Sequence, residues 1–145
     1  MYAIVDIETT GSNTNLNRII EIAIVTTNGQ EIISTYSTLI NPGIHIPAMI
    51  TGLTGITNEE VSCAPNFASV CDDIWAELQD KIFVAHNVGF DFGFVKSEFE
   101  REDLDFSAKK LCTVRLSRKI VPGNRSYNLG AICSRMGIEI VDRHR

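Results

Sequence analysis

The chain has 145 residues, of which 44% are hydrophobic and 21% are charged, and its formal net charge is −5. This length and composition are typical of one globular domain with its own core, and no apolar run approaches the ~20 residues of a membrane span. The acidic balance argues against binding of nucleic acid through a broad basic surface, but it allows an acidic pocket that metal ions bridge to phosphate.

The first predicted element is a buried strand over residues 3–7, which a Thr-Thr-Gly-Ser turn signal closes. Asp6 and Glu8 lie near its end and point to the same face, roughly 6–7 Å apart, because side chains alternate along a strand. Two such anions repel each other and lose hydration, and a divalent cation removes both penalties. Oxygen ligands favour Mg²⁺ or Mn²⁺ over zinc. The simpler interpretation is a solvated pair, or a pair salt-bridged to Arg18.

Two further strands are expected at residues 18–25 and 31–40, joined through Asn28-Gly29, which is a strong hairpin signal. The three strands therefore form an antiparallel meander. A short helix or turn follows at residues 46–53, and Thr57 with Glu60 forms a capping box for another helical turn.

The second half of the chain alternates helices with short strands. Ala64-Pro65 opens a helix whose buried face has helical spacing: Phe67, Val70, Cys71, Ile74, Trp75 and Leu78. Strands are predicted at residues 81–85 and 111–112, and helices at residues 90–100, 113–120 and up to Met136, the last capped by Ser126 or Asn128 and ended by Gly137. A meander followed by such units predicts an α/β protein with a mixed sheet and helices on both faces.

Asp91 is expected at the start of a helix that follows a strand directly. The helix dipole and free backbone amides there favour its anionic form, beside the end of the first strand. Asn87, four residues earlier, can hold the loop by donating to backbone carbonyls. By themselves these two residues indicate little more than helix capping.

Together with the first strand, they match a known pattern. The chain resembles the DnaQ-like (DEDD) 3′–5′ exonucleases of the histidine branch, which include the proofreading epsilon subunit of bacterial DNA polymerase III, in Asp6-Ile7-Glu8-Thr9-Thr10-Gly11, Asn87-x-x-Phe90-Asp91 and His144. Weaker agreement lies at residues 18–23, 53–57 and 126–129. The resemblance implies a ribonuclease H-like fold and hydrolysis of single-stranded DNA 3′ ends to nucleoside 5′-monophosphates.

The resemblance also implies roles for particular residues. Asp6, Glu8 and Asp91 would hold two Mg²⁺ or Mn²⁺ ions, which stabilise the attacking and leaving oxygens of a phosphodiester. His144 would be the general base. The terminal nucleotide would be bound by Thr9, Thr10, Gly11, Leu53, Thr54 and Asn87, with Leu53 wedged against a base.

One departure concerns the third motif. The family places a metal-binding Asp five residues after the histidine, near position 149, whereas the sequence ends at Arg145. We therefore expect a single exonuclease domain over residues 1–145 that is truncated before the end of this motif. The alternatives are an RNA exonuclease of the oligoribonuclease type and a non-catalytic module that binds nucleic-acid ends or a DNA polymerase.

The remaining polar residues have simpler interpretations. His45 is expected in an exposed loop and His86 in a structural hydrogen bond. A basic cluster at Arg115, Arg118, Lys119 and Arg125 is expected to be a solvated face or a patch that follows a nucleic-acid backbone. Reduced thiols are expected at Cys63, Cys71, Cys112 and Cys133, which lack metal-site spacing. The N-terminus carries no signal-peptide pattern, so a cytoplasmic location is expected.

Overall fold

A five-stranded mixed sheet organises the computed structural model, which describes residues 1–140. In spatial order its strands are β3 (Ile32–Leu39), β2 (Ile19–Thr27), β1 (Tyr2–Thr9), β4 (Ile82–Ala85) and β5 (Lys110–Cys112). The first three strands pair antiparallel, and β4 and β5 run parallel to β1. The predicted meander and the mixed sheet are therefore confirmed.

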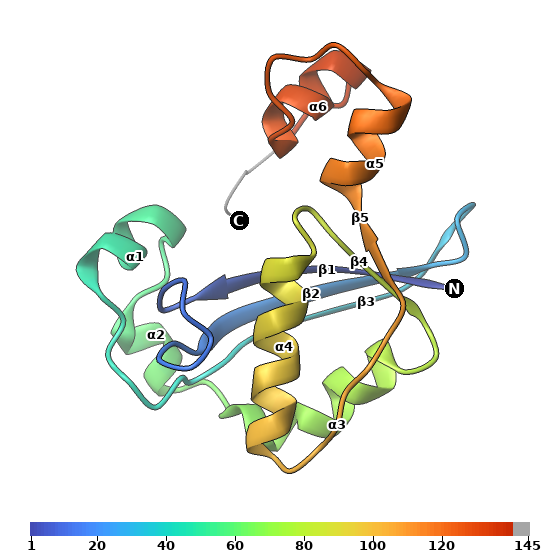
Figure 1. Cartoon of the computed structure of the whole chain (residues 1–145). Coiled ribbons are helices and arrows are strands. Elements are labelled where there is room, and N and C mark those ends of the chain that lie inside the picture. The colour runs from blue at the N-terminus through green and yellow to red at the C-terminus, as the bar shows by residue number, and fades with distance from the viewer. Residues whose placement is uncertain (141–145) are drawn as a thin grey trace.

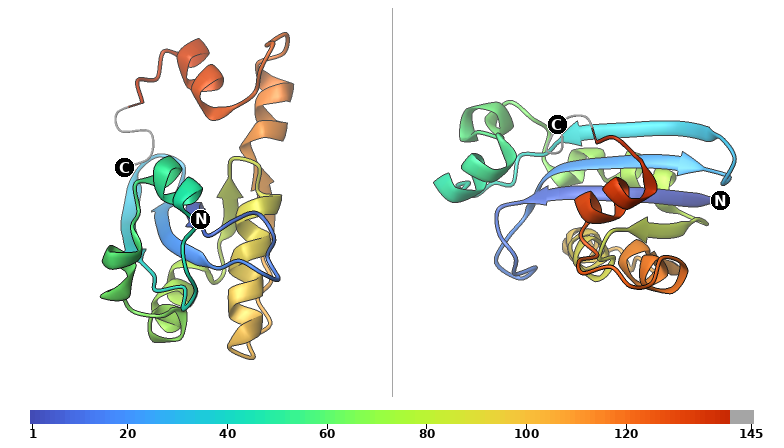
Figure 2. Two further views of the ribbon diagram at one scale, coloured as in Figure 1. Left: turned by 90° about the vertical axis from the view of Figure 1, so that its left-hand side faces the viewer. Right: turned by 90° about the horizontal axis from the view of Figure 1, so that it is seen from above.

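Six helices of the described chain surround this sheet: α1 (Ala48–Thr54), α2 (Asn58–Ser62), α3 (Phe67–Leu78), α4 (Gly89–Arg101), α5 (Thr113–Ile120) and α6 (Leu129–Met136). Figures 1 and 2 show α3 on one side of the sheet and α6 on the other, with α1 beside the carboxyl end of β1. Helices thus lie on both sides, as predicted. Among residues 1–140, no helix is long and apolar enough to cross a bilayer.

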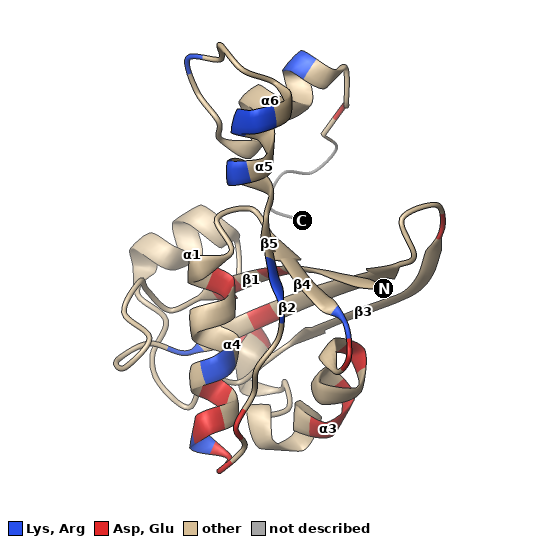
Figure 3. Ribbon diagram, turned by 45° about the vertical axis from the view of Figure 1, so that its right-hand side comes forward, with Lys and Arg blue, Asp and Glu red and all other residues tan. Residues whose placement is uncertain are grey.

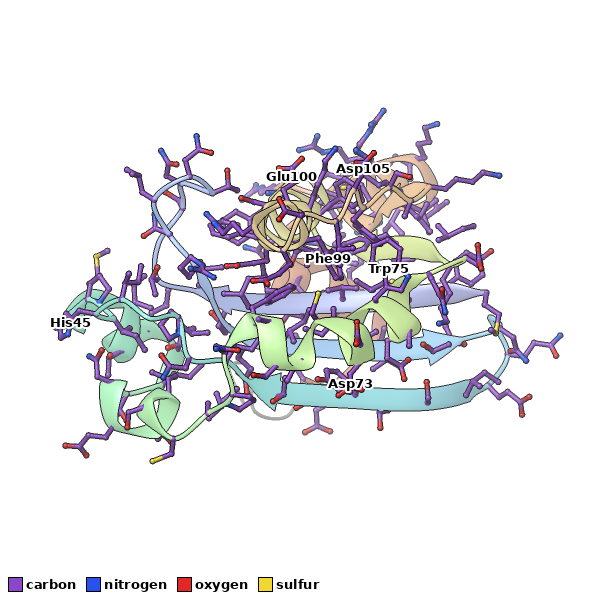
Figure 4. The ribbon with its side chains drawn as sticks, turned by 90° about the horizontal axis from the view of Figure 1, so that it is seen from below. His45, Asp73, Trp75, Phe99, Glu100 and Asp105 are labelled. Carbon is purple, nitrogen blue, oxygen red and sulfur yellow. The ribbon has the colours of Figure 1, made fainter. Side chains whose placement is uncertain are left out.

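The core lies between the sheet and the pair α3 and α4. Trp75 contacts Phe99 edge-on, with ring centroids 5.3 Å apart, and the two rings meet between these helices (Figure 4). Trp75 is only half-buried, so it borders the core that its spacing predicts. The Arg18 guanidinium and the buried carboxylate of Glu98 add a partly buried ion pair that joins the start of β2 to α4, with Nη2 and Oε2 2.8 Å apart.

Several predicted boundaries move by one or two residues. Strand β1 continues through both carboxylates to Thr9, beyond the predicted end at Ile7. Helix α3 begins after Asn66, whose side chain accepts the Ser69 amide at 2.9 Å, so Ala64-Pro65 lies before the cap and does not open the helix. Asn128, and not Ser126, caps α6.

Candidate active site

Strand β1 places Asp6 and Glu8 on one face of the sheet. Its odd-numbered residues Ala3, Val5 and Ile7 are buried in the core, whereas Asp6 is exposed and Glu8 is half-buried on the opposite side. The predicted shared face of the two carboxylates is therefore confirmed. The pleat of a strand with one buried face determines this placement.

The salt-bridge interpretation for Arg18 is wrong. Arg18 donates from Nε to both oxygens of Glu98, at 2.9 and 3.0 Å. Glu98 is 1% exposed and also accepts the Ile19 amide at 3.2 Å. Because Arg18 faces α4, it does not neutralise the carboxylates of β1.

Glu21 joins the two predicted carboxylates and was missed from the sequence. It lies directly opposite Glu8 in the β1–β2 pair. Burial, followed by repulsion from Asp6 and Glu21, raises the pKa of Glu8 to about 7. The sequence could have indicated Glu21 as a site residue, because it is a charged residue inside the otherwise apolar run Ile19-Ile20-Glu21-Ile22.

Asp91 occupies the first turn of α4 and is 5% exposed. Burial raises its pKa to about 7, hydrogen bonds from the backbone amides of Asp91 and Ile7 oppose that shift, and repulsion from Asp6 and Glu8 adds to it. The backbone amides therefore favour the anion, as predicted, but burial and like charge outweigh them. The Ile7 amide places the Asp91 carboxylate between Asp6 and Glu8 along β1.

These carboxylates have the donor chemistry of a hard divalent cation. Each one disfavours the charged form of its neighbours, a penalty that a bound cation reverses. Within residues 1–140, however, no three His, Cys, Asp or Glu side chains are gathered closely enough to hold an ion.

A pocket of about 360 Å³ adjoins Glu8. It lies between the end of β1, the loop that follows it and α1, and its lining includes Thr9, Thr10, Gly11, Leu53 and Thr54. Five residues that were predicted to bind a terminal nucleotide are thus brought together. Phe90, half-exposed at the start of α4, lines another side of the pocket. It was named from the sequence only within the second motif, and no binding role was predicted for it.

Hydrogen bonds fix the loop that forms one wall of this pocket. Thr9 donates through Oγ1 to the Gly11 carbonyl at 2.7 Å, and Thr10 Oγ1 accepts the Arg18 amide at 3.0 Å. A Cβ on Gly11 would approach Asn17 Oδ1 to 2.6 Å, so a larger residue there would require the Asn17 side chain to move. The threonine hydroxyls therefore maintain the loop, together with the Thr10 amide, which donates to the Arg18 carbonyl at 2.9 Å.

One other predicted site residue, Asn87, does not line this pocket. Asn87 is exposed with a φ of 73° and lines a different, basic groove with Val88 and Gly89. Within residues 1–140 its side chain makes no hydrogen bond to a carbonyl, so the expected loop-holding role is wrong. Asn supports the turn instead by tolerating the left-handed conformation. His144, the predicted general base, lies outside the described residues.

The other histidines behave as predicted. His86 Nε2 donates to the Tyr127 carbonyl at 2.9 Å, and Nδ1 lies 2.9 Å from Thr113 Oγ1, so this ring ties β4 to α5 and the segment before α6. His45 is exposed at the far end of the molecule (Figure 4). All four cysteines are free thiols, of which Cys63 alone is exposed.

Comparisons with known proteins agree with this geometry. The exonuclease family model RNase_T matches residues 3–145. The 3′-5′ exonuclease DinG of Staphylococcus epidermidis is 37% identical over 99% of this chain, and that of Staphylococcus aureus is 36% identical over the same share. The chain spans only 16% of the length of either relative.

Solved structures confirm the ribonuclease H-like exonuclease fold. Exonuclease X in complex with 5′ overhanging duplex DNA is 25% identical, with a TM-score of 0.78 over 97% of this chain and 75% of that chain. E. coli Exonuclease I in complex with a dT13 oligonucleotide has a TM-score of 0.85 at 20% identity, over 99% of this chain and 37% of that chain. At the latter identity the likeness concerns the fold alone.

Proposed function

Because this chain belongs to the RNase_T exonuclease family, we propose that it is a metal-dependent 3′–5′ exonuclease acting on single-stranded DNA ends. The observation that carries the proposal is the position of Glu8. Its side chain lines the nucleotide-sized pocket and also repels Asp91 across the acidic face. A strand end in this pocket would bring its last phosphodiester beside the carboxylates.

The pocket has features of a site for one nucleotide. Its volume lies in the range of roughly 300–1,000 Å³ that is usual for ligand sites. Leu53, Met49 and Phe90 offer apolar surface for a base, and the loop at residues 9–12 forms the wall that would face the sugar and phosphate. Leu53 is 60% exposed, so its side chain is available for contact with a base.

The carboxylates and His144 divide the chemistry. Asp6, Glu8 and Asp91 would hold two Mg²⁺ or Mn²⁺ ions, which when bound stabilise charge on the attacking and leaving oxygens. His144 takes the proton of the attacking water, for which a group that titrates near neutral pH is suited. The backbone amides of Ile7 and Asp91 hold the Asp91 carboxylate in place.

The experiment is digestion of a 5′-labelled single-stranded DNA oligomer with Mg²⁺, with Mn²⁺ or with EDTA. We expect a ladder that shortens from the 3′ end in either metal and intact oligomer in EDTA. The same assay on a chain extended past position 149 tests the expected additional Asp through a gain in rate. Intact oligomer under every condition, with both chains, would contradict the proposal.

The same assay also tests two alternative functions. An RNA oligomer of matched sequence distinguishes an oligoribonuclease-type enzyme, because that choice depends on contacts around the 2′-hydroxyl. Binding of ends without cleavage would indicate the non-catalytic module. The relatives named above are DinG and Exonucleases I and X, so a proofreading role with a polymerase partner gains no support from them.

A further inference from the structure

The charges of this chain are divided along the sequence. Residues 106–138 contain seven Lys and Arg and no Asp or Glu, whereas residues 1–105 contain four Lys and Arg and sixteen Asp and Glu. Figure 3 shows the consequence in space, with blue residues on β5, α5 and α6 and red residues concentrated on α3 and the far part of α4. Residues 1–140 of this acidic protein therefore include a basic region that adjoins the carboxyl end of β4.

This region contains a groove of about 760 Å³ between β5, α5 and the turn before α4. Four exposed cations line it, namely Lys110, Arg115, Arg118 and Lys119. Arg125, which the sequence grouped with them, does not line the groove, and Lys110 takes its place. We call this feature the basic groove.

The cations of the basic groove are available to a ligand. Within residues 1–140, the ion pairs use Arg18, Lys96 and Arg101, and none uses a cation of the groove. Aromatic rings support two of the four: Lys110 Nζ lies 4.4 Å from the centroid of Phe92, and Arg118 Cζ lies 5.6 Å from that of Tyr127. Four unpaired cations around one hollow fit a polyanion.

The turn that carries Asp91 separates the basic groove from the nucleotide pocket. Asn87 and Gly89 line the groove, and Phe90, the next residue, lines the pocket. A strand whose last base fills the pocket can therefore reach the groove by crossing this turn. The groove has about twice the volume of the pocket, which leaves room for the backbone of more than one nucleotide.

We propose that the basic groove binds the backbone phosphates of the strand just upstream of the nucleotide being removed, an inference that rests on the proposed function. Cations that contact phosphates release counterions from the strand, so each contact contributes to the salt dependence of binding. The contact is to phosphate and not to a base edge, so it does not depend on sequence.

The test measures binding of a 5′-fluorescein dT15 oligomer by anisotropy, in EDTA, over a series of salt concentrations. The variant R115Q/K119Q removes two groove cations that lie one helical turn apart and whose side chains form no ion pair among residues 1–140. The control K81Q/K96Q removes the same charge from the acidic side of the molecule. We expect the first variant to bind more weakly and to lower the slope of log K against log salt by about 1.4. The loss should grow with oligomer length from dT2 to dT15, and the control should follow the unmodified chain.

Three results would overturn the inference: no binding of dT15 by the unmodified chain, an unchanged slope in R115Q/K119Q, or equal losses in both double variants. Because binding is measured without metal, the result does not depend on catalysis. If binding depends on the groove but the chain never shortens DNA, the proposal for the groove stands and the proposed exonuclease activity is rejected. Shortening of DNA with an unchanged slope in R115Q/K119Q would do the reverse.

Discussion

Glu8 has carboxylates on two sides, Asp6 along its own strand and Glu21 across the pair to β2. These neighbouring carboxylates repel one another in the folded domain, and the repulsion destabilises their charged forms. Asp91 adds a buried carboxylate to the same face. The arrangement is costly for the free protein and suited to a bound cation, which is the physical reason to assign it to catalysis.

The first residue-scale prediction concerns Asp6. Asp6→Ala should lower the rate of metal-dependent hydrolysis by at least about 10²–10³-fold, the scale of losing one electrostatic stabiliser of a transition state. The fold should persist, because Asp6 is exposed. The measurement is the initial rate of 3′ shortening in Mg²⁺, with Asp73→Ala, on the exposed side of α3, as the matched control. Near-full activity in Asp6→Ala would remove the basis of the metal assignment.

The second concerns Leu53 in the nucleotide pocket. Leu53→Ala should cost about 1–2 kcal/mol of apolar contact with the terminal base, so KM should rise about five- to thirtyfold. Since Leu53 is 60% exposed, thermal stability should change little. Steady-state kinetics on the labelled oligomer give KM, and Leu104→Ala, in the segment after α4, provides a surface leucine for comparison. A KM equal to that of the unmodified chain would place the base elsewhere.

At the scale of elements, the ion pair of Arg18 and Glu98 joins β2 to α4 and so positions the helix that presents Asp91. Arg18→Ala leaves Glu98, which is 1% exposed, with the Arg101 guanidinium at 3.3 Å and the Ile19 amide at 3.2 Å. Loss of one partner from a buried pair costs about 3–5 kcal/mol, and the remaining partners place this case toward the lower end.

Urea unfolding followed by circular dichroism measures that loss as a lower midpoint at constant slope. Lys96→Ala is the comparison, because Lys96 forms only exposed contacts, with Glu100 at 3.6 Å and Asp105 at 3.9 Å, and such pairs contribute little. Equal midpoints for the two variants would mean that α4 is held by its apolar face alone.

Elements with strong local signals were predicted closely from sequence. Helix α5 has the predicted bounds of residues 113–120, and the Thr57–Glu60 capping box forms as expected. The start of α3 was misplaced because Pro65 favours the first turn of a helix and also the segment before a cap, and the side chain of Asn66 decides between them. Local chemistry determines element type more firmly than element ends.

At the scale of the molecule, the shared face of Asp6 and Glu8 followed from one strand, so sequence periodicity predicted it. The partners of these residues depend on register and distance along the chain. Glu21 lies opposite Glu8 because the turn at residues 10–18 determines the pairing, and Arg18 finds Glu98 eighty residues away. The basic groove likewise requires β5 to lie beside β4, which no local pattern specifies.

The acidic face makes the stability of the whole domain depend on pH and metal. The pKa values of Glu8 and Asp91 are both raised to about 7, so between about pH 4 and 7 the folded protein holds protons that the unfolded chain has lost. Stability from these protons is present at low pH and lost as pH rises through 7. In EDTA the thermal midpoint should therefore decrease as the pH rises from about 5.5 to 8. Mg²⁺ should raise the midpoint more at pH 8, where the ion no longer competes with protons.

The variant E8Q/D91N should weaken the dependence of the midpoint on pH and on Mg²⁺, whereas Asp105→Asn, whose side chain is 92% exposed, should leave both dependences unchanged. A midpoint that rises with pH in the unmodified chain would show that other groups control its acid stability.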